Sequence, residues 1–360
     1  MLNYDLMDSL YGKDILVYGL GSVSKALLPR LYAMPEKFRL YGIALTHIEQ
    51  EKQYQNTGLQ IRSIHYWAKE CPNATVLIAT SDTYHKEIAE VCKGEGFRNI
   101  VPVTSALKDF ITQTFFEYYL TNKGVNLEGD YIELGNAKFI NPLTARWHQN
   151  LNVFGQLSDI VFPHLFSDWN LLDEGPYDPD GILELTEGCT VLDCGANLGT
   201  FSAYAASKGC KCYAFEPTPE LQPVLHKYAE LYPGIIPVES AVSNKNGTTA
   251  LYLSSYSCGA NSLLTRVHST KSIMVPTITI DEFVKSNQIE KVDFIKADIE
   301  GAERLMLEGA QETLLKHAPK LSLCTYHLPD DKKVLAELIL RANSKYTIQY
   351  HWEKLYAYVP

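Results

Sequence analysis

Residues 190 to 205 read TVLDCGANLGTFSAYA, and this stretch decides the fold of the C-terminal part of the chain. Its first residues form an apolar run typical of a buried β-strand, and its last residues have a helical pattern. Between them lies the turn DCGANLG, in which Gly195 and Gly199 allow the backbone to approach a ligand closely. A strand, a glycine-rich turn and a helix in this order predict a nucleotide-binding site.

The turn also brings a carboxylate to the predicted site. Asp193 lies beside the place where a dinucleotide would set its pyrophosphate, and like charges at that distance repel each other. S-adenosylmethionine carries an adenosine, a sulfonium and an ammonium group but no phosphate. The turn therefore favours this methyl donor over NAD.

The composition is that of an ordinary globular protein with two domains: 360 residues, 46% hydrophobic and 21% charged. No apolar run reaches the roughly 18 residues of a membrane span, and the N-terminal MLNYDLMDSLYGKD has acids where a signal peptide is basic and then apolar. We therefore expect a cytoplasmic protein without a membrane span. Eight cysteines without a C-x-x-C pair predict reduced thiols, with no zinc site and no disulfide framework.

Charge is distributed unevenly along the chain. Residues 1–125 hold 13 basic and 13 acidic side chains, so the whole net charge of −10 lies in residues 126–360. Without a basic stripe to neutralise phosphates, we expect no nucleic acid partner and no binding to an anionic membrane surface. A small or uncharged substrate fits this charge better.

The pattern of residues 1–122 predicts a small Rossmann-like domain, in which apolar strands alternate with helices. Its glycine turn reads GLGSVS at residues 19–24, and its second strand ends in Thr46 and His47, where an NAD site needs an acid for the ribose. Two interpretations stay open: a structural domain, or a pocket for a nucleotide or nucleotide-sugar. Residues 123–170 predict a linker and a helical segment from about residue 144 to 168, which packs on the core or on a second subunit of a homo-oligomer.

From residue 171 to 360, strands and helices alternate regularly and end in two closely spaced strands. The predicted strands cover residues 190–194, 211–215, 235–239, 292–297, 321–326, 346–350 and 354–358, with a hairpin near 249–253 and 273–279. The main predicted helices cover residues 198–208, 301–316 and 331–343, with another beginning at Thr218. We predict an α/β fold with two doubly wound domains, of which the C-terminal one is a seven-stranded class I methyltransferase fold.

Polar residues at the ends of these strands are the candidate ligand contacts, because ligands of doubly wound sheets bind outside the carboxyl ends of the strands. Glu216 follows the second strand, 23 residues after Asp193, where an acid can accept both ribose hydroxyls. The alternative is that Glu216 only caps the helix that follows. Ser240 and Ala241 end the third strand, and their small side chains leave room for the edge of an adenine.

The fourth and fifth strands end in groups that suit catalysis. Asp298 and Glu300 follow the fourth strand and His327 follows the fifth. With its ordinary pKa of about 6.5, His327 suits a base that removes the proton of an acceptor hydroxyl. Alternatively, Asp298, Glu300 and His327 together hold a divalent cation that lowers the pKa of the hydroxyl. A third interpretation is structural, with the imidazole hydrogen-bonded to a neighbouring carboxylate.

Several ordered motifs of residues 170–330 resemble the FkbM-type class I S-adenosylmethionine-dependent methyltransferases. They are EGPY (174–177), VLDCGANLGTFS (191–202), YAFEPTPE (213–220), SAVSNKNG (240–247), PTITIDEF (276–283) and DFIKADIEGAE (293–303). The resemblance implies O-methylation of a hydroxyl, commonly on a sugar or polyketide. The donor contacts that it implies, together with neighbouring residues of the same motifs, are Tyr177, Asp193, Gly195, Ala196, Asn197, Gly199, Glu216, Pro217, Ser240, Ala241 and Asp298.

One departure from the family pattern concerns the cation. Members of the family often end the fifth strand with Glu-x-His, whereas this chain has Thr325-Tyr326-His327, which makes a three-ligand metal site less favoured. The N-terminal domain looks like the nucleotide-sugar-reading domains of bacterial sugar-modifying enzymes, which implies a sugar acceptor, as a nucleotide-sugar or a surface glycan precursor. Two rival functions remain: an NAD-dependent oxidoreductase with two dinucleotide folds, and a non-catalytic binding scaffold.

Overall fold

The computed structural model describes residues 10–48, 52–54, 57–141, 157, 176–179, 181–254, 258–264, 269–351 and 353–360. The chain divides into two compact units, residues 1–127 and 128–360. Both contain a largely parallel sheet with helices, so the predicted α/β class is confirmed. The helical segment predicted for residues 144–168 lies outside the described residues, except for Leu157, and so do Glu174 and Gly175.

The N-terminal unit contains a six-stranded sheet in the order β3-β4-β2-β1-β5-β6. All neighbouring pairs are parallel except β3 with β4. The strands are β1 (Asp14–Tyr18), β2 (Arg39–Leu45), β3 (Lys52–Gln53), β4 (Gln60–Ser63), β5 (Thr75–Ile78) and β6 (Asn99–Pro102). The helices are α2 (Ser22–Tyr32), α3 (Ile64–Glu70), α4 (His85–Gly94) and α5 (Ser105–Asn122), with the 3-10 turn η1 (Asp82–Tyr84).

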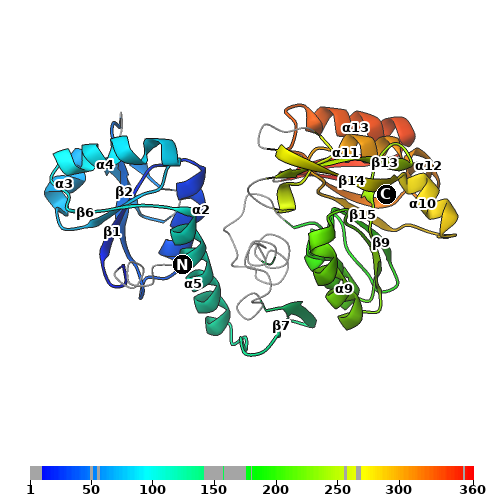
Figure 1. Ribbon diagram of the computed structural model, residues 1–360, viewed down its shortest axis with the longest axis horizontal. Helices are drawn as coiled ribbons and strands as arrows, with labels where there is room; N and C mark the ends of the chain where they lie inside the picture. Colours follow the sequence, from blue (N-terminus) through cyan, green and yellow to red (C-terminus); the bar gives the residue numbers. More distant parts are fainter. Residues whose placement is uncertain are drawn as a thin grey trace. The chain divides into compact units, whose positions relative to one another are not determined.

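Strand β1 lies inside this sheet, between β2 and β5, and four of its five residues are buried. Its side chains alternate between the two faces. Leu16 and Tyr18 pack with Trp67 of α3 and Cys92 of α4, which share one apolar core. Helices therefore cover the sheet as expected for a doubly wound unit (Figure 1).

The C-terminal unit contains a seven-stranded sheet in the order β11-β10-β9-β15-β16-β18-β17. The first five strands of this order are parallel, and β18 pairs antiparallel with both β16 and β17. The strands are β9 (Thr190–Cys194), β10 (Lys211–Phe215), β11 (Ile235–Val238), β15 (Phe294–Ala297), β16 (Lys320–Cys324), β17 (Thr347–His351) and β18 (Lys354–Tyr358). The strand order changes direction between β9 and β15, because β10 and β11 lie on one side of β9 and the later strands lie on the other. The glycine turn after β9 and the end of β15 are therefore neighbours.

Helices cover both faces of this sheet (Figure 1). The helices α10 (Ile280–Ser286), α11 (Glu303–Glu308), α12 (Gln311–Lys316) and α13 (Asp331–Ala342) share one apolar core with the strands. The remaining helices of the unit are α8 (Thr200–Ser207) and α9 (Gln222–Leu231), the latter preceded by the 3-10 turn η4 (Pro219–Leu221). The strands at the centre are buried almost throughout, as parallel strands between two helical layers require.

Two smaller sheets complete the C-terminal unit. Strands β13 (Gly247–Ser254) and β14 (Ser269–Ile278) form an antiparallel pair. The short strand β12 (Ala241–Val242) pairs parallel with the other edge of β14. The 3-10 turn η5 (Cys258–Ala260) lies between β13 and β14 in the sequence. The hairpin of β7 (Tyr131–Leu134) and β8 (Ala137–Ile140) forms the other sheet. The sequence predicted the first hairpin but not the second.

One long helix expected from the sequence is two helices in the structure. The helix predicted for residues 301–316 is interrupted between α11 and α12 at Gly309 and Ala310. At the interruption, a Cβ added at Gly309 would lie 2.2 Å from the carbonyl oxygen of Ser243, so the close approach of this other segment requires glycine.

Among the described residues, none of the helices combines the length and the apolar composition needed to cross a bilayer. Seven of the eight cysteines are free thiols in this part of the chain, and the burial of Cys92 raises the pKa of its thiol to about 11.

A tyrosine hydroxyl connects the β7–β8 hairpin to helix α9. The backbone N–H of Ile140 donates to the hydroxyl of Tyr228 at 3.0 Å, in a buried position. Replacing Tyr228 by Phe leaves this N–H without its acceptor, which costs about 1–3 kcal/mol and should lower the Tm by about 2–10 °C in calorimetry of the full chain. In the matched control, Tyr232→Phe, the lost partner of Lys138 is exposed and water replaces it. Equal losses in the two variants would contradict this account.

Candidate functional site

A pocket lies at the carboxyl ends of β9, β10 and β15, where the sheet reverses its strand order. It is lined by Tyr177, Gly195, Asn197, Phe215, Glu216, Pro217, Thr218, Ala241, Val242, Leu251, Gly259, Ala260, Asn261, Leu263, Lys296, Asp298, Ile299, Glu300, Ala302 and Tyr326. This is the position at which doubly wound sheets bind their ligands. The pocket belongs entirely to the C-terminal unit.

A buried ion pair holds the floor of the pocket. Lys296 of β15 reaches across to β9, where its ammonium lies 3.0 Å from a carboxylate oxygen of Asp193 and donates to the carbonyl oxygen of Gly195 at 2.7 Å. Both side chains are almost wholly buried, and the hydroxyl of Ser202 donates to the other oxygen of Asp193 at 2.6 Å. The charges raise the pKa of Lys296 although burial acts in the opposite direction. Lys296 therefore stays an ammonium that fixes the glycine turn.

The glycine turn packs directly on the end of β15. Gly195 has φ +79°, and a Cβ at this position would lie 2.1 Å from the carbonyl oxygen of Asp298. Asn197 also has a positive φ of 51°, which asparagine tolerates better than most residues. The turn therefore needs glycine at residue 195 for both its conformation and its close approach to β15.

Glu216 at the end of β10 presents its carboxylate in the pocket. One oxygen accepts from the N–H of Asn197 at 3.0 Å, and the other accepts from the N–H of Thr218 at 2.8 Å. Each carboxylate oxygen retains a further lone pair for a ligand hydroxyl. Burial raises the pKa of this carboxyl although the hydrogen bonds lower it. Glu216 does accept N–H groups near the start of a helix, as the alternative interpretation required, but it also lines the pocket.

Apolar side chains line the part of the pocket next to Glu216. Val242 of β12, Leu251 of β13 and Leu263, which follows η5, line this part of the pocket. Asn261 stands at its edge and donates to the hydroxyl of Thr218 at 3.3 Å. An adenine combines a flat apolar face with a polar edge, and this wall provides both surfaces.

The opposite end of the pocket is acidic. The hydroxyl of Tyr177 donates to one oxygen of Asp298 at 3.0 Å, and the Tyr326 hydroxyl lies 3.4 Å from the other oxygen. The ammonium groups of Lys296 and Lys354 lie 5.4 and 4.3 Å from the ring centre of Tyr177, so the electron-rich ring faces two cations. Burial raises the pKa of Asp298, but the nearby cations and hydrogen bonds outweigh it and hold the pKa below its ordinary value.

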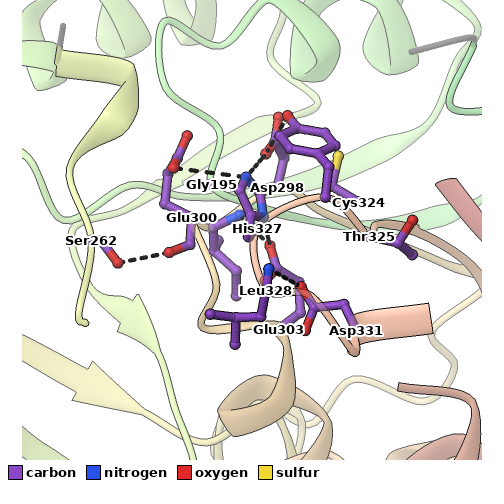
Figure 2. A network of polar contacts seen from close by, with 12 residues as sticks. Gly195, Ser262, Asp298, Glu300, Glu303, Cys324, Thr325, His327, Leu328 and Asp331 are labelled. Carbon is purple, nitrogen blue, oxygen red and sulfur yellow. Dashed lines mark hydrogen bonds and ion pairs between the residues drawn. The ribbon is translucent and has the colours of Figure 1, made fainter. Parts of the chain in front are cut away.

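His327 connects three carboxylates at this acidic end (Figure 2). Its Nδ1 lies 3.1 Å from an oxygen of Glu303, and its Nε2 lies 3.5 Å from Asp298 and 3.7 Å from Glu300. The Glu303 oxygen also accepts from the N–H of Ile299 at 2.9 Å, so the loop after β15 and the loop after β16 share one acceptor. The side chain of His327 is 2% exposed.

The surroundings of His327 change its acid–base behaviour. Burial alone lowers its pKa, but the hydrogen bond to Glu303 and the charges of Glu303, Asp298 and Glu300 outweigh burial and raise the pKa to about 9. Without another cation in the cluster, His327 is therefore protonated at neutral pH. The ordinary pKa that we expected for a base at this position is not what the structure supports.

The structure brings most of the predicted site residues to one pocket. Among the described residues, its lining includes Tyr177, Gly195, Asn197, Glu216, Pro217, Ala241, Asp298 and Glu300. His327 lies behind this wall, in contact with Asp298 and Glu300. The predicted contacts that do not line it are Asp193, Ala196, Gly199 and Ser240. Asp193 is the main correction, because its fully buried carboxylate is engaged by Lys296 and cannot reach a ligand directly.

The sequence did not predict the part of the pocket wall that β13 and the residues after η5 provide. Leu251 and Asn261 reach the pocket from a hairpin that lies more than 30 residues from Glu216 in sequence. Lys296 lies in the motif DFIKADIEGAE at the end of the fourth strand, but the sequence did not predict its partner Asp193. Successive side chains of a strand point to opposite faces of the sheet, so the sequence KADIE (296–300) does indicate that residues 296 and 298 point the same way.

The glycine turn of the N-terminal unit has fewer features that indicate a bound ligand. Gly21 precedes helix α2 and provides no side-chain cap, and the hydroxyls of Tyr18 and Thr46 are hydrogen-bonded to each other at the ends of β1 and β2. His85 Nε2 lies 3.1 Å from the carbonyl oxygen of Thr80. Ligand binding by this unit remains a prediction.

Comparison with known proteins identifies residues 193–348 with the methyltransferase FkbM domain. A curated relative, the hexuronic acid methyltransferase AglP of Haloferax volcanii, is 25% identical over 217 residues, which cover 59% of this chain and 86% of AglP. The FkbM match begins at the glycine turn and ends in β17, so it contains nearly all of the pocket.

Two solved structures resemble the chain more distantly. The methyltransferase FkbM of Methylobacillus flagellatus is 17% identical and aligns over 97% of this chain and 90% of its own, with a TM-score of 0.42. Fibrillarin of Aeropyrum pernix, in complex with S-adenosyl-L-methionine, is 13% identical over 49% of this chain and 69% of its own, with a TM-score of 0.32.

The buried pair of Lys296 and Asp193 predicts a large stability effect. Lys296→Met leaves the Asp193 carboxylate buried without its countercharge, which costs about 3–5 kcal/mol and should lower the Tm by about 10 °C. The double variant with Asp193→Asn removes both charges and should recover most of this loss. Scanning calorimetry of the full chain tests both. A single variant within about 2 °C of the parent, or a double variant worse than the single one, would contradict the assigned role.

Proposed function

The C-terminal unit of this chain is an FkbM-type methyltransferase domain, and we propose that it transfers a methyl group from S-adenosylmethionine to a hydroxyl group of a sugar. The observation that carries the proposal is the carboxylate of Glu216, held in the pocket by two backbone N–H groups. A carboxylate at this distance along the chain from the glycine turn suits the two hydroxyls of a ribose.

The pocket residues fit this donor from one end to the other. Glu216 receives the ribose hydroxyls, while Val242 and Leu251 cover the adenine. Gly195 and Asn197 bring backbone groups to the amino acid end of the donor. Asp193 acts through Lys296, which holds the turn in place.

The donor supplies a methyl group on a sulfonium, which already is a good leaving group. The protein therefore contributes mainly by orienting the two substrates, and orientation alone supplies a large part of the rate of such bimolecular reactions. The acidic end of the pocket is where we propose that the acceptor hydroxyl binds. Asp298 and Glu300 are hydrogen-bond acceptors for that hydroxyl, and Tyr326, which is 41% exposed, offers an aromatic surface to the sugar.

The sugar acceptor is supported by the relative AglP, which is named a hexuronic acid methyltransferase. A hexuronic acid carries a carboxylate beside several hydroxyls. We therefore propose a sugar, and first a sugar acid, as the acceptor, in the form of a nucleotide-sugar or a glycan precursor.

A product assay tests the function. The full chain is incubated with S-adenosylmethionine and a panel of nucleotide-linked and glycan hexuronic acids and neutral hexoses. Mass spectrometry should detect one added methyl group on a sugar, together with S-adenosylhomocysteine. Donor binding without transfer to any member of the panel would instead favour the non-catalytic scaffold.

Replacement of Glu216 tests the donor pocket. Glu216→Gln removes a charge that accepts ribose hydroxyls, and a hydrogen bond to a charged group contributes about 1.5–3 kcal/mol. The Kd for S-adenosylhomocysteine should rise about 10- to 100-fold in isothermal titration calorimetry. The matched control is Glu239→Gln, because Glu239 follows the neighbouring strand β11, is exposed and does not line the pocket. Equal binding by the two variants would remove Glu216 from the site.

A further inference from the structure

We infer that Asp298, Glu300 and His327 bind a divalent cation at the acidic end of the pocket. The inference about binding rests on geometry, and the role given to the cation rests in addition on the proposed methyl transfer. The comparisons with known proteins do not assign a metal to this chain. This chain lacks Glu-x-His at the end of the fifth strand, but Asp298, Glu300 and His327 bring three donor groups together without that glutamate.

The three donor groups stand at distances suited to a shared ion. One ligand atom from each of the three residues lies within 4.8 Å of the others. His327 Nε2 is 3.5 Å from Asp298 Oδ1 and 3.7 Å from Glu300 Oε2. In an octahedral site with bonds of about 2.1 Å, adjacent ligand atoms are about 3 Å apart and opposite ones about 4.2 Å apart. The two distances from His327 Nε2 lie between these values. A small movement of the three side chains therefore brings their donor atoms to the positions that one shared ion requires.

The nitrogen that points into this cluster is buried and has no hydrogen-bond partner in the described structure. His327 Nε2 is inaccessible to solvent, and its separations from both carboxylates are longer than hydrogen bonds. A buried polar atom without a hydrogen bond is destabilising unless a ligand satisfies it. A cation between Nε2 and the two carboxylates satisfies all three groups at once.

Neighbouring groups hold the three donor side chains in place through hydrogen bonds. Glu303 lies 3.1 Å from His327 Nδ1, which fixes the ring and leaves Nε2 to face the cluster. Tyr177 donates to Asp298 Oδ2, which leaves Oδ1 on the side of the imidazole. The hydroxyl of Ser262 donates to the backbone carbonyl of Glu300 at 2.7 Å and holds the loop that carries this side chain (Figure 2).

A bound cation explains how an anionic sugar binds beside the carboxylates of Asp298 and Glu300. Asp298 and Glu300 line the pocket, and a hexuronic acid brings a further carboxylate toward them. Like charges at this distance repel each other. Three protein ligands leave positions on the cation open, so that the acceptor's carboxylate and the neighbouring hydroxyl can occupy them.

The same coordination activates the hydroxyl. A bound cation lowers the pKa of an oxygen that coordinates it, so the hydroxyl releases its proton to water. The oxygen then forms a bond to the methyl carbon while the carbon–sulfur bond breaks and its electron pair stays on sulfur. The products are the methyl ether of the sugar, S-adenosylhomocysteine and one proton. This arrangement needs no neutral, unbound His327 as a base.

Manganese binding tests the site directly. Mn²⁺ alone is titrated into the full chain and followed by electron paramagnetic resonance, which reports free Mn²⁺. We expect one site per chain and a loss of affinity of at least about tenfold in Glu300→Gln, which keeps the shape of the side chain. The control is Glu337→Gln, because Glu337 is exposed on α13 and lies outside the cluster. It should bind Mn²⁺ as the parent does.

A second variant keeps the test informative if Glu300→Gln is unstable. Glu303→Gln changes no ligand but weakens the orientation of His327, so it should bind Mn²⁺ less tightly while donor binding stays normal. No binding at millimolar Mn²⁺ in the parent chain, or equal binding in the parent and Glu300→Gln, overturns the site. Full methyl transfer in excess chelator overturns the role. Specific Mn²⁺ binding without transfer to any sugar would leave the site in place and contradict the proposed function instead.

Discussion

One buried ion pair connects the parts on which the pocket depends. Lys296 comes from the middle of the sheet, and its ammonium holds both the Asp193 carboxylate and the carbonyl oxygen of Gly195. Because a buried charge without a partner is very costly, the two strands β9 and β15 are held in register at the point where their ends form the pocket. This ion pair therefore helps to position both the glycine turn and the loop after β15.

The loop fixed in this way separates two chemically different ends of the pocket. On the side of β10 and β12, Glu216 stands beside apolar side chains, which suits an adenosine. On the side of β16, Asp298 and Glu300 meet the imidazole of His327, which suits a polar acceptor and a cation. In the proposed reaction, the methyl group is transferred where the substrates bound at these two ends meet.

Much of this organisation could be predicted from the sequence, because it depends on local patterns. The strand, turn and helix at residues 190–205 gave the fold class, and acids at strand ends identified Glu216 and Asp298. Features set by distant contacts could not be predicted in the same way. The burial of Asp193 depends on a lysine 103 residues later, and the raised pKa of His327 depends on three carboxylates from the loop after β15 and the start of α11. The walls provided by the β13–β14 hairpin depend on its placement over the sheet.

We expect the pocket of the C-terminal unit to hold S-adenosylmethionine rather than a dinucleotide. Calorimetric titration of the full chain with S-adenosylmethionine and, separately, with NADH measures this directly. The account predicts saturable binding of S-adenosylmethionine with one molecule per chain and no heat of binding for NADH. Binding of NADH together with no binding of S-adenosylmethionine would contradict it.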